Sequence, residues 1–277
     1  LLIKAGSGLQ TFGNPSSAGI PEEAVKHTLV LEYNDINELN EAFKLYAEQI
    51  ACVILEPFAG NMNLVRPSTQ FIHTLRQLCT THNSILIFDE VMTGFRVGLG
   101  CAQQLLNIKP DLTTLGKVIG GGMPLAGFGG KKEIMDCLAP IGNVYQAGTL
   151  SGNPIAVTAG LANLQLIQQE GFYPNLNKIS QQLTHGLTKL AHAKGLAFSA
   201  DYIGGMFGFY FLENIPTSFN AVKQAEQTVF NKFFHHMLDN GVFFAPSMFE
   251  AGFICSMHTP EVINQTLALA EDALAKF

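Results

Sequence analysis

The chain has 277 residues, of which 47% are hydrophobic and 14% charged, and its formal net charge at pH 7 is −6. This composition predicts a globular protein with a large core, in one large domain or two smaller ones. Its charge pattern contains no basic stripe for nucleic acid or an anionic membrane surface, and its apolar runs are far shorter than the roughly 20 residues of a membrane helix. We therefore expect neither class of partner.

The N-terminal segment over residues 5–21 is a polar loop rich in glycine, serine and proline, and it includes Ser7 and Gly8. Loops of this length are usually functional lids or disordered segments, and the composition leaves both readings open. The chain opens with Leu1 rather than methionine and shows no targeting pattern. We therefore expect a fragment that lacks its true N-terminus together with any targeting signal.

Two continuous apolar runs, at residues 51–55 and 84–88, predict buried strands that each end at a carboxylate, Glu56 and Asp89. The intervening segment 67–82 has helical spacing of its apolar residues, which completes a β-α-β unit. Strands that are apolar throughout are typical of parallel sheets, and ligands bind beyond the carboxyl ends of such strands. Both carboxylates are therefore expected at the ligand-binding edge.

Short runs at 112–115 and 125–129 predict two further strands, and between them lies Lys117, followed by six glycines within thirteen residues. A lysine near glycines is most simply an exposed side chain. The alternative is a partly desolvated amine that attacks a carbonyl. The spacing alone does not separate the two readings.

The second half of the chain mixes helices and strands in an α+β pattern, which suggests a division into residues 1–165 and a smaller domain over 166–277. Its predicted helices cover residues 153–169, 174–194, 219–239 and 260–276, and its predicted strands cover 196–200, 205–211, 242–245 and 253–257.

Three residues at strand ends or helix starts suit the cofactor pyridoxal phosphate. Lys117 would form a Schiff base with its aldehyde, and Asp89 would keep its pyridine nitrogen protonated. Thr149 lies in the stretch QAGTLSGNP before a helix, where free backbone N–H groups favour a phosphate. Each residue also has a plainer role, because strand-end carboxylates cap helices or pair with arginines and Thr149 can cap the following helix.

Four segments carry a more specific signal: ILEPFAGNMN, FDEVMTGFRVG, TLGKVIGGGMPLAGFGG and QAGTLSGNP. Together they resemble the signature of the class III aminotransferase family of pyridoxal-phosphate enzymes. The resemblance implies an α/β, aspartate-aminotransferase-like (fold-type I) large domain, incomplete at its N-terminal side, plus a small C-terminal α+β domain. It implies that Lys117 is the Schiff-base lysine, and that the other cofactor-binding residues are Asp89, Val91, Thr149, Glu56 and Asn61.

The motifs favour a mutase branch of this family, because FRVG replaces the Gly-Arg-Thr-Gly of many members and GNMN follows Glu56 and Pro57. The implied reaction moves the amino group of glutamate 1-semialdehyde to give 5-aminolevulinate, a tetrapyrrole precursor, through the pyridoxamine phosphate form of the cofactor. Lys117 would move protons as general acid and base. One alternative is an ω-aminotransferase that uses an external amine donor, and another is a non-catalytic dimerising or binding fragment.

The resemblance also implies a mobile lid that contains Ser7 and Gly8. Glu250, in FEAGF, would contact the lid or the substrate, although a solvated glutamate is an equal reading. A homodimer in the cytoplasm is expected, with Thr149 donated across the dimer interface, and a plastid origin stays open. The absent N-terminal part would supply backbone amides around the phosphate and an aromatic residue stacked on the ring.

Several other residues have plainer interpretations. The five cysteines form no CxxC pair and are expected to be buried thiols that serve packing. His235 and His236 point to different helix faces, so no metal site is expected. Arg66 and Arg96 could each bind a substrate carboxylate or pair with a local acid. The phenylalanines over 207–211 and 230–234 are expected in the core.

Overall fold

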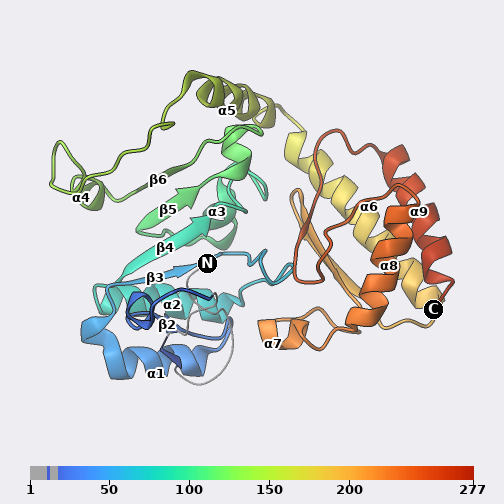
Figure 1. Cartoon of the computed structure of the whole chain (residues 1–277), viewed down its shortest axis with the longest axis horizontal. Helices are drawn as coiled ribbons and strands as arrows, with labels where there is room; N and C mark the ends of the chain where they lie inside the picture. Colours follow the sequence, from blue (N-terminus) through green and yellow to red (C-terminus); the bar gives the residue numbers. More distant parts are fainter. Residues whose placement is uncertain (1–10, 13–17) are drawn as a thin grey trace.

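The structure, a computed structural model, describes residues 11–12 and 18–277 and contains two separate main sheets (Figure 1). Ser7 and Gly8 of the predicted lid lie outside the described residues. Every helix in the described part of the chain is too short or too polar to cross a membrane.

The first main sheet has the strand order β3-β4-β5-β6, formed by Cys52–Leu55, Ile85–Glu90, Leu112–Leu115 and Gly127–Gly130. β3, β4 and β5 are parallel, and β6 is antiparallel to β5. The four strands predicted in this region are therefore confirmed, with ends displaced by at most two residues. The carboxyl ends of β3, β4 and β5 lie at one edge, as the predicted β-α-β unit requires.

Two helices cover one face of this sheet: α1 (Ile36–Tyr46) and α2 (Thr69–Thr81). The Asp35 side chain caps α1 by accepting from the Glu38 N–H, and Ser68 caps α2 in the same way. Their apolar sides and the inward residues of β4 form one core, which contains Leu39, Phe43, Phe71, Ile72, Leu75, Leu86 and Phe88.

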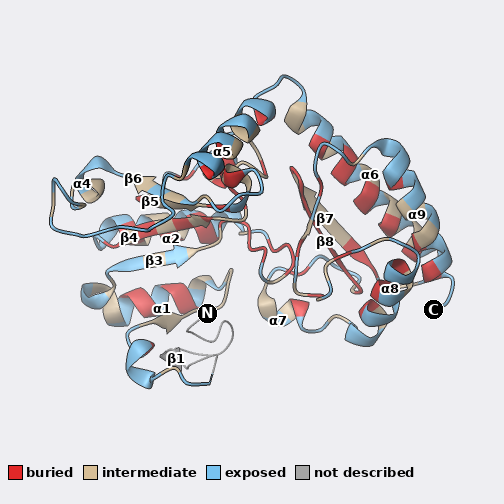
Figure 2. Ribbon diagram, turned by 45° about the horizontal axis from the view of Figure 1, so that its top comes forward, coloured by how far each residue is buried: buried red, intermediate tan, exposed pale blue. Residues whose placement is uncertain are grey.

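The opposite face of the same sheet is open to solvent within the described chain. Its strand pairing places on this face the side chains of Cys52, Ile54, Ile85, Ile87, Asp89, Leu112, Thr114 and Phe128. Ile54 is 59% exposed and Phe128 46% exposed, and β3 is largely drawn as exposed in Figure 2. Sheets with parallel strands are normally covered on both faces, so this apolar face stands out.

The second main sheet is antiparallel and consists of β7 (Ser199–Ile203), β8 (Met206–Tyr210) and β9 (Gly252–Phe253). Three helices lie along it: α6 (Phe172–Ala193), α8 (Gln227–Asp239) and α9 (Pro260–Leu274) (Figure 1). Their shared core contains Phe207, Phe209, Phe211, Phe230, Phe233 and Phe234, so the prediction that these phenylalanines serve packing is confirmed.

Two predictions in this half are wrong. Residues 242–245 form no strand; Phe244 is buried against the rings of Phe207, Phe209 and Phe233, so packing rather than strand pairing explains the apolar pattern. The helix predicted over 219–239 is two helices, α7 (Phe219–Val222) and α8. They bury their apolar sides in different clusters, because Val222 packs with Tyr210 while α8 joins the phenylalanine core.

The strand predicted over 253–257 overlaps β9 only at Phe253, and residues 254–257 form no strand. The remaining elements are short apart from α5. They are β1 (Thr11–Phe12), β2 (Leu29–Val30), α3 (Cys101–Leu106), α4 (Lys132–Met135), α5 (Pro154–Ile167) and the 3-10 helices η1 (Glu22–Ala24), η2 (Ala47–Gln49) and η3 (Lys117–Gly120). The division into 1–165 and 166–277 stays a prediction.

The cysteines are only partly as predicted. All five are free thiols, and Cys79 and Cys101 are buried, which raises the pKa of each to about 11. Cys52, Cys137 and Cys255 are exposed instead, so the packing role predicted for them is wrong. Cys52 lies on the open sheet face, and Cys137 and Cys255 lie in the segments that follow α4 and β9.

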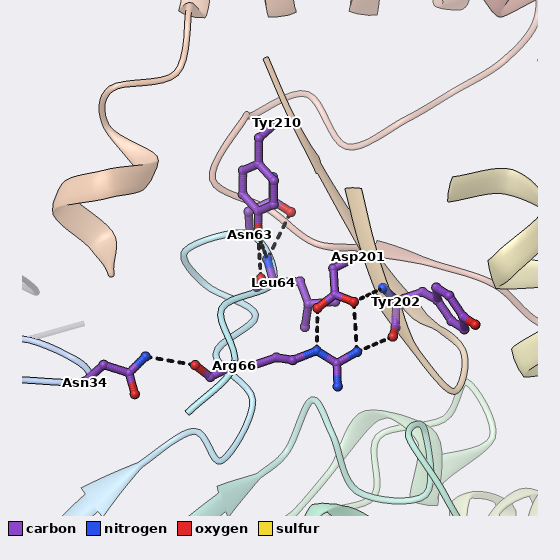
Figure 3. Close-up of polar contacts among 7 residues, drawn as sticks. All are labelled: Asn34, Asn63, Leu64, Arg66, Asp201, Tyr202 and Tyr210. Carbon is purple, nitrogen blue, oxygen red and sulfur yellow. Dashed lines mark hydrogen bonds and ion pairs between the residues drawn. The ribbon is translucent and has the colours of Figure 1, made fainter. Parts of the chain in front are cut away.

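A segment that follows β3 joins the two sheets (Figure 3). The buried Asn63 donates from Nδ2 to the carbonyl oxygens of Phe209 and Met248, 3.0 Å from each. The Tyr210 hydroxyl accepts from the Leu64 N–H at 2.9 Å and donates to the Leu64 carbonyl at 2.5 Å. Arg66 forms an ion pair with Asp201. The stretch that begins at Glu56 is thereby anchored to the second sheet.

The Tyr210 hydroxyl gives a direct test of this junction. Tyr210→Phe should lower the free energy of unfolding by about 1–3 kcal/mol, because it leaves the buried Leu64 carbonyl without a partner, whereas the Leu64 N–H keeps Oδ1 of Asn63 as an acceptor. Tyr202→Phe is the matched control, since the hydroxyl of Tyr202 bonds to none of the described residues; its effect should stay within about 0.5 kcal/mol. Urea unfolding measures both, and equal losses in the two variants would contradict the role of the Leu64 bonds.

Candidate active site

Lys117 begins η3 directly after β5, as expected for a residue at a strand end. Its φ is 46°, in the left-handed region that L-residues with side chains rarely adopt. Such conformations cost about 1–3 kcal/mol and cluster at functional sites. The side chain is exposed in this chain alone, where the neighbouring sheet face is open, as in the first of the two readings of this lysine.

Gly116, just before the lysine, packs tightly on the segment after β4. A Cβ atom added to this buried glycine would lie 3.2 Å from Cγ1 of Val91. Val91 in turn donates its backbone N–H to Oδ1 of Asp89, at 3.0 Å. The fold therefore brings Lys117, Val91 and Asp89 to the same end of the sheet.

Asp89 lies at the end of β4 and pairs in register with Thr114 of β5. Its Oδ1 accepts from both the Val91 N–H and the Thr114 hydroxyl, the latter at 3.2 Å. Oδ2 has no hydrogen-bond partner among the described residues. One oxygen is thus fixed by the protein, and the other is available to a cationic N–H donor.

Glu56 and Asn61 form a tight loop after β3. The Glu56 carboxylate accepts from the Asn61 amide through Oε1 and from the Gly60 N–H through Oε2, each at 2.7 Å. A Cβ atom added to Gly60 would lie 1.9 Å from Sδ of Met92, so a larger residue there would require the Met92 side chain to move. The loop therefore packs directly on the segment that follows Asp89 and Val91. In this chain, both carboxylate oxygens of Glu56 serve to shape that loop.

Glu250 lies close to the same loop. The N–H of its neighbour Ala251 donates to the Gly60 carbonyl at 3.3 Å, and the Glu250 side chain is exposed. Both readings of this glutamate, solvated side chain or contact to a lid, fit that position.

Thr149 is not the cap of the following helix. Asn153 takes that role, because its side chain accepts from the Ala156 N–H at the start of α5. Thr149 is exposed in the excursion between α4 and α5 and hydrogen-bonds to none of the described residues. The structure does not bring it together with Lys117 and Asp89 within one chain.

The two arginines left open by the sequence differ in their surroundings. Arg66 is committed to Asp201 and to the Tyr202 carbonyl. Arg96 donates from Nε to the Met92 carbonyl at 2.8 Å and stacks on the Phe253 ring at 4.0 Å, and burial lowers its pKa to about 10. Within the described residues Arg96 has no acid partner, so it stays a candidate for binding a substrate carboxylate. Arg66 is not a candidate, because its guanidinium already pairs with Asp201.

Three further residues shape the site without having been predicted. Thr114 holds Asp89, Gly60 admits Met92, and the Tyr33 hydroxyl donates to the Glu56 carbonyl at 3.0 Å. Burial, followed by the charge of Glu56, holds the pKa of Tyr33 well above its usual value. Of these three, only Gly60 could have been noticed in the sequence, because it follows the strand-end carboxylate Glu56 within the segment ILEPFAGNMN.

The family model Aminotransferase class-III matches residues 4–268. The chain belongs to the class III aminotransferase family. A curated relative from Neisseria meningitidis serogroup C, named glutamate-1-semialdehyde 2,1-aminomutase, is 60% identical over 270 residues, which are 98% of this chain and 63% of the relative. The chain thus spans about 63% of the length of that relative.

Solved structures agree with this assignment. An omega-transaminase from Sphaerobacter thermophilus has a TM-score of 0.89 and 25% identity, covering 95% of this chain and 60% of its own. A transaminase with PLP bound has a TM-score of 0.85 and 25% identity, covering 98% and 62%. The predicted fold-type I architecture, present in part, is therefore confirmed.

Proposed function

We propose that this chain takes part in the conversion of glutamate 1-semialdehyde into 5-aminolevulinate by pyridoxal-phosphate-dependent transfer of an amino group within one molecule. The observation that carries this proposal is the 60% identity to an aminomutase across 98% of the chain. An ω-aminotransferase role has weaker support, because the omega-transaminase with the similar fold is 25% identical.

The residues at the end of the first sheet fit the proposed cofactor. Oδ2 of Asp89 has no other partner in the described part of the chain and can accept from a protonated pyridine nitrogen. Lys117 would supply the amine for the aldehyde, and Val91, Glu56 and Asn61 would lie near the ring. When bound, pyridoxal phosphate supplies an aldehyde that captures amines and a ring that withdraws electrons.

The chain's own residues then have separate tasks. Lys117 moves protons through its Nζ at the two substrate carbons that exchange the amino group. The Val91 N–H and the Thr114 hydroxyl hold Oδ1 of Asp89, which would leave Oδ2 to accept from the ring nitrogen. Glu250, with Ser7 and Gly8, would close the site against loss of the reacting molecule; Ser7 and Gly8 lie outside the described residues.

A second copy of the chain is the proposed partner, in the cytoplasm. Apolar side chains are exposed along the excursion before α5 and on α5 itself, with Tyr145 84% and Ile155 72% exposed. Exposed apolar patches of this kind mark interaction surfaces. Thr149 lies in the same excursion, so in a homodimer it would bind the cofactor phosphate of the partner subunit.

The test separates a mutase from an aminotransferase by its need for a second substrate. It uses an extended version, in which the N-terminal third of the Neisseria relative precedes residues 1–277. With cofactor and glutamate 1-semialdehyde alone, 5-aminolevulinate should form. Product that requires an added amine donor would indicate an aminotransferase, and no product under either condition would indicate a non-catalytic chain.

A further inference from the structure

The loop that joins β9 to α9, residues 254–259, holds a cysteine against a histidine. Sγ of Cys255 lies 3.3 Å from Nδ1 of His258. The Cys255 N–H donates to the same nitrogen at 3.0 Å, and the His258 N–H donates back to the Cys255 carbonyl at 3.1 Å. Because Nδ1 accepts the backbone N–H, the neutral imidazole carries its proton on Nε2. Its Nδ1 is therefore a base that faces the thiol.

Both ends of this loop are fixed to the fold. At one end, Ile254 is buried and its N–H donates to the Gly205 carbonyl at 2.8 Å. At the other end, the Thr259 side chain caps α9. The thiol and the imidazole are thus held in contact by a short segment between two anchors, while the Cys255 side chain stays exposed.

The other four cysteines lack this combination of exposure and base. Cys79 and Cys101 are buried, out of reach of a reagent in solution. Cys137 is exposed, but its thiol donates to the Glu133 carbonyl at 3.7 Å, which cannot accept a proton. Cys52 is exposed on β3, and its thiol hydrogen-bonds to none of the described residues. Cys52 and Cys137 therefore serve as internal standards for an exposed thiol without a base.

We propose that Cys255 is a thiol-modification site that reacts with low-molecular-weight disulfides and that His258 is its base. The Cys255 proton passes to Nδ1 of His258, and the thiolate attacks one sulfur of the disulfide. A new S–S bond forms at Cys255 as the bond of the reagent breaks, and the released thiolate takes up one proton. When Nδ1 of His258 takes the thiol proton, the Cys255 N–H loses this acceptor and donates to water instead, because the loop is exposed. This reactivity is independent of the proposed amino transfer.

The first measurement uses the unmodified 277-residue chain and the disulfide dithiobis(nitrobenzoate). We expect one fast phase of thiol release, at least about tenfold faster than the release from the other exposed cysteines. This factor is smaller than the roughly 10²–10⁴-fold rate enhancement that a general base gives in an active site. Peptide mapping of the early adduct should locate it at Cys255. An early adduct at Cys52 or Cys137, or equal rates at all three exposed thiols, would overturn the proposal without recourse to any variant.

Variants then test the base. Cys255→Ser should remove the fast phase, and His258→Asn and His258→Gln should each slow the reaction of Cys255 to the rate of Cys52 and Cys137. His235→Asn, at an exposed histidine on α8, is the matched control and should leave the fast phase unchanged. Circular dichroism confirms that each variant is folded. An unchanged rate at Cys255 in both His258 variants would exclude His258 as the base.

Discussion

Asp89→Asn is expected to lower the turnover of the extended version by about 10²–10³-fold, the loss typical of one preorganised electrostatic partner. The amide oxygen can still accept from the Val91 N–H and the Thr114 hydroxyl, so the local structure is retained. The uncharged amide no longer favours a protonated pyridine nitrogen, so the electron-withdrawing power of the ring is lost.

The matched control for this change is Asp136→Asn, an identical substitution at a surface residue that pairs with Lys132. Its turnover should equal that of the parent. Thermal unfolding of both variants should show little change, which separates a chemical loss from a folding loss. Turnover of Asp89→Asn close to that of the parent would rule out the proposed pairing with the ring nitrogen.

A polypeptide of residues 1–277 alone is expected to bind pyridoxal phosphate several powers of ten more weakly than the extended version. The family resemblance places part of the phosphate cradle and a ring-stacking aromatic in the N-terminal segment. Each charge-assisted amide bond contributes about 1.5–3 kcal/mol, and stacking about 0.5–1.5 kcal/mol. The open sheet face around Ile54 and Phe128 should also promote association.

Two measurements on the two polypeptides check this expectation. Titration with pyridoxal phosphate, followed by the visible absorbance of the lysine-bound cofactor, gives the two affinities. Sedimentation gives the association state at each concentration. Equal affinities would show that residues 1–277 hold every contact needed for binding, and would contradict the expected contribution of the N-terminal segment.

The sequence was most informative where local pattern and tertiary position agree. The runs at 51–55 and 84–88 became strands because continuous apolar runs suit a sheet with parallel strands. Serine and threonine favour the position just before a helix, and the side chains of Ser68 and Thr259 cap α2 and α9. The strand-end positions of Asp89 and Lys117 followed from these local patterns.

The contacts that define the site depend on strand register and on distant parts of the chain, which no local pattern contains. Thr114 holds Asp89 only because β4 and β5 pair in that register. Arg66 meets Asp201 across 135 positions of sequence, and this contact removes Arg66 from the candidates for a substrate carboxylate. The strand predicted over 242–245 is absent for a similar reason. The apolar Phe244 packs on the ring of Phe209, a residue distant in sequence, instead of pairing in a sheet.

Reductive trapping of the cofactor tests the central claim, that Lys117 is the residue that binds it covalently. Borohydride treatment of the cofactor-loaded chain, followed by peptide mapping, should locate the adduct at Lys117. Lys117→Ala should lose both the adduct and the visible absorbance, whereas the control Lys109→Ala, at an exposed lysine, should keep both. An adduct at Lys109, Lys131 or Lys132, or an unchanged absorbance in Lys117→Ala, would contradict the account.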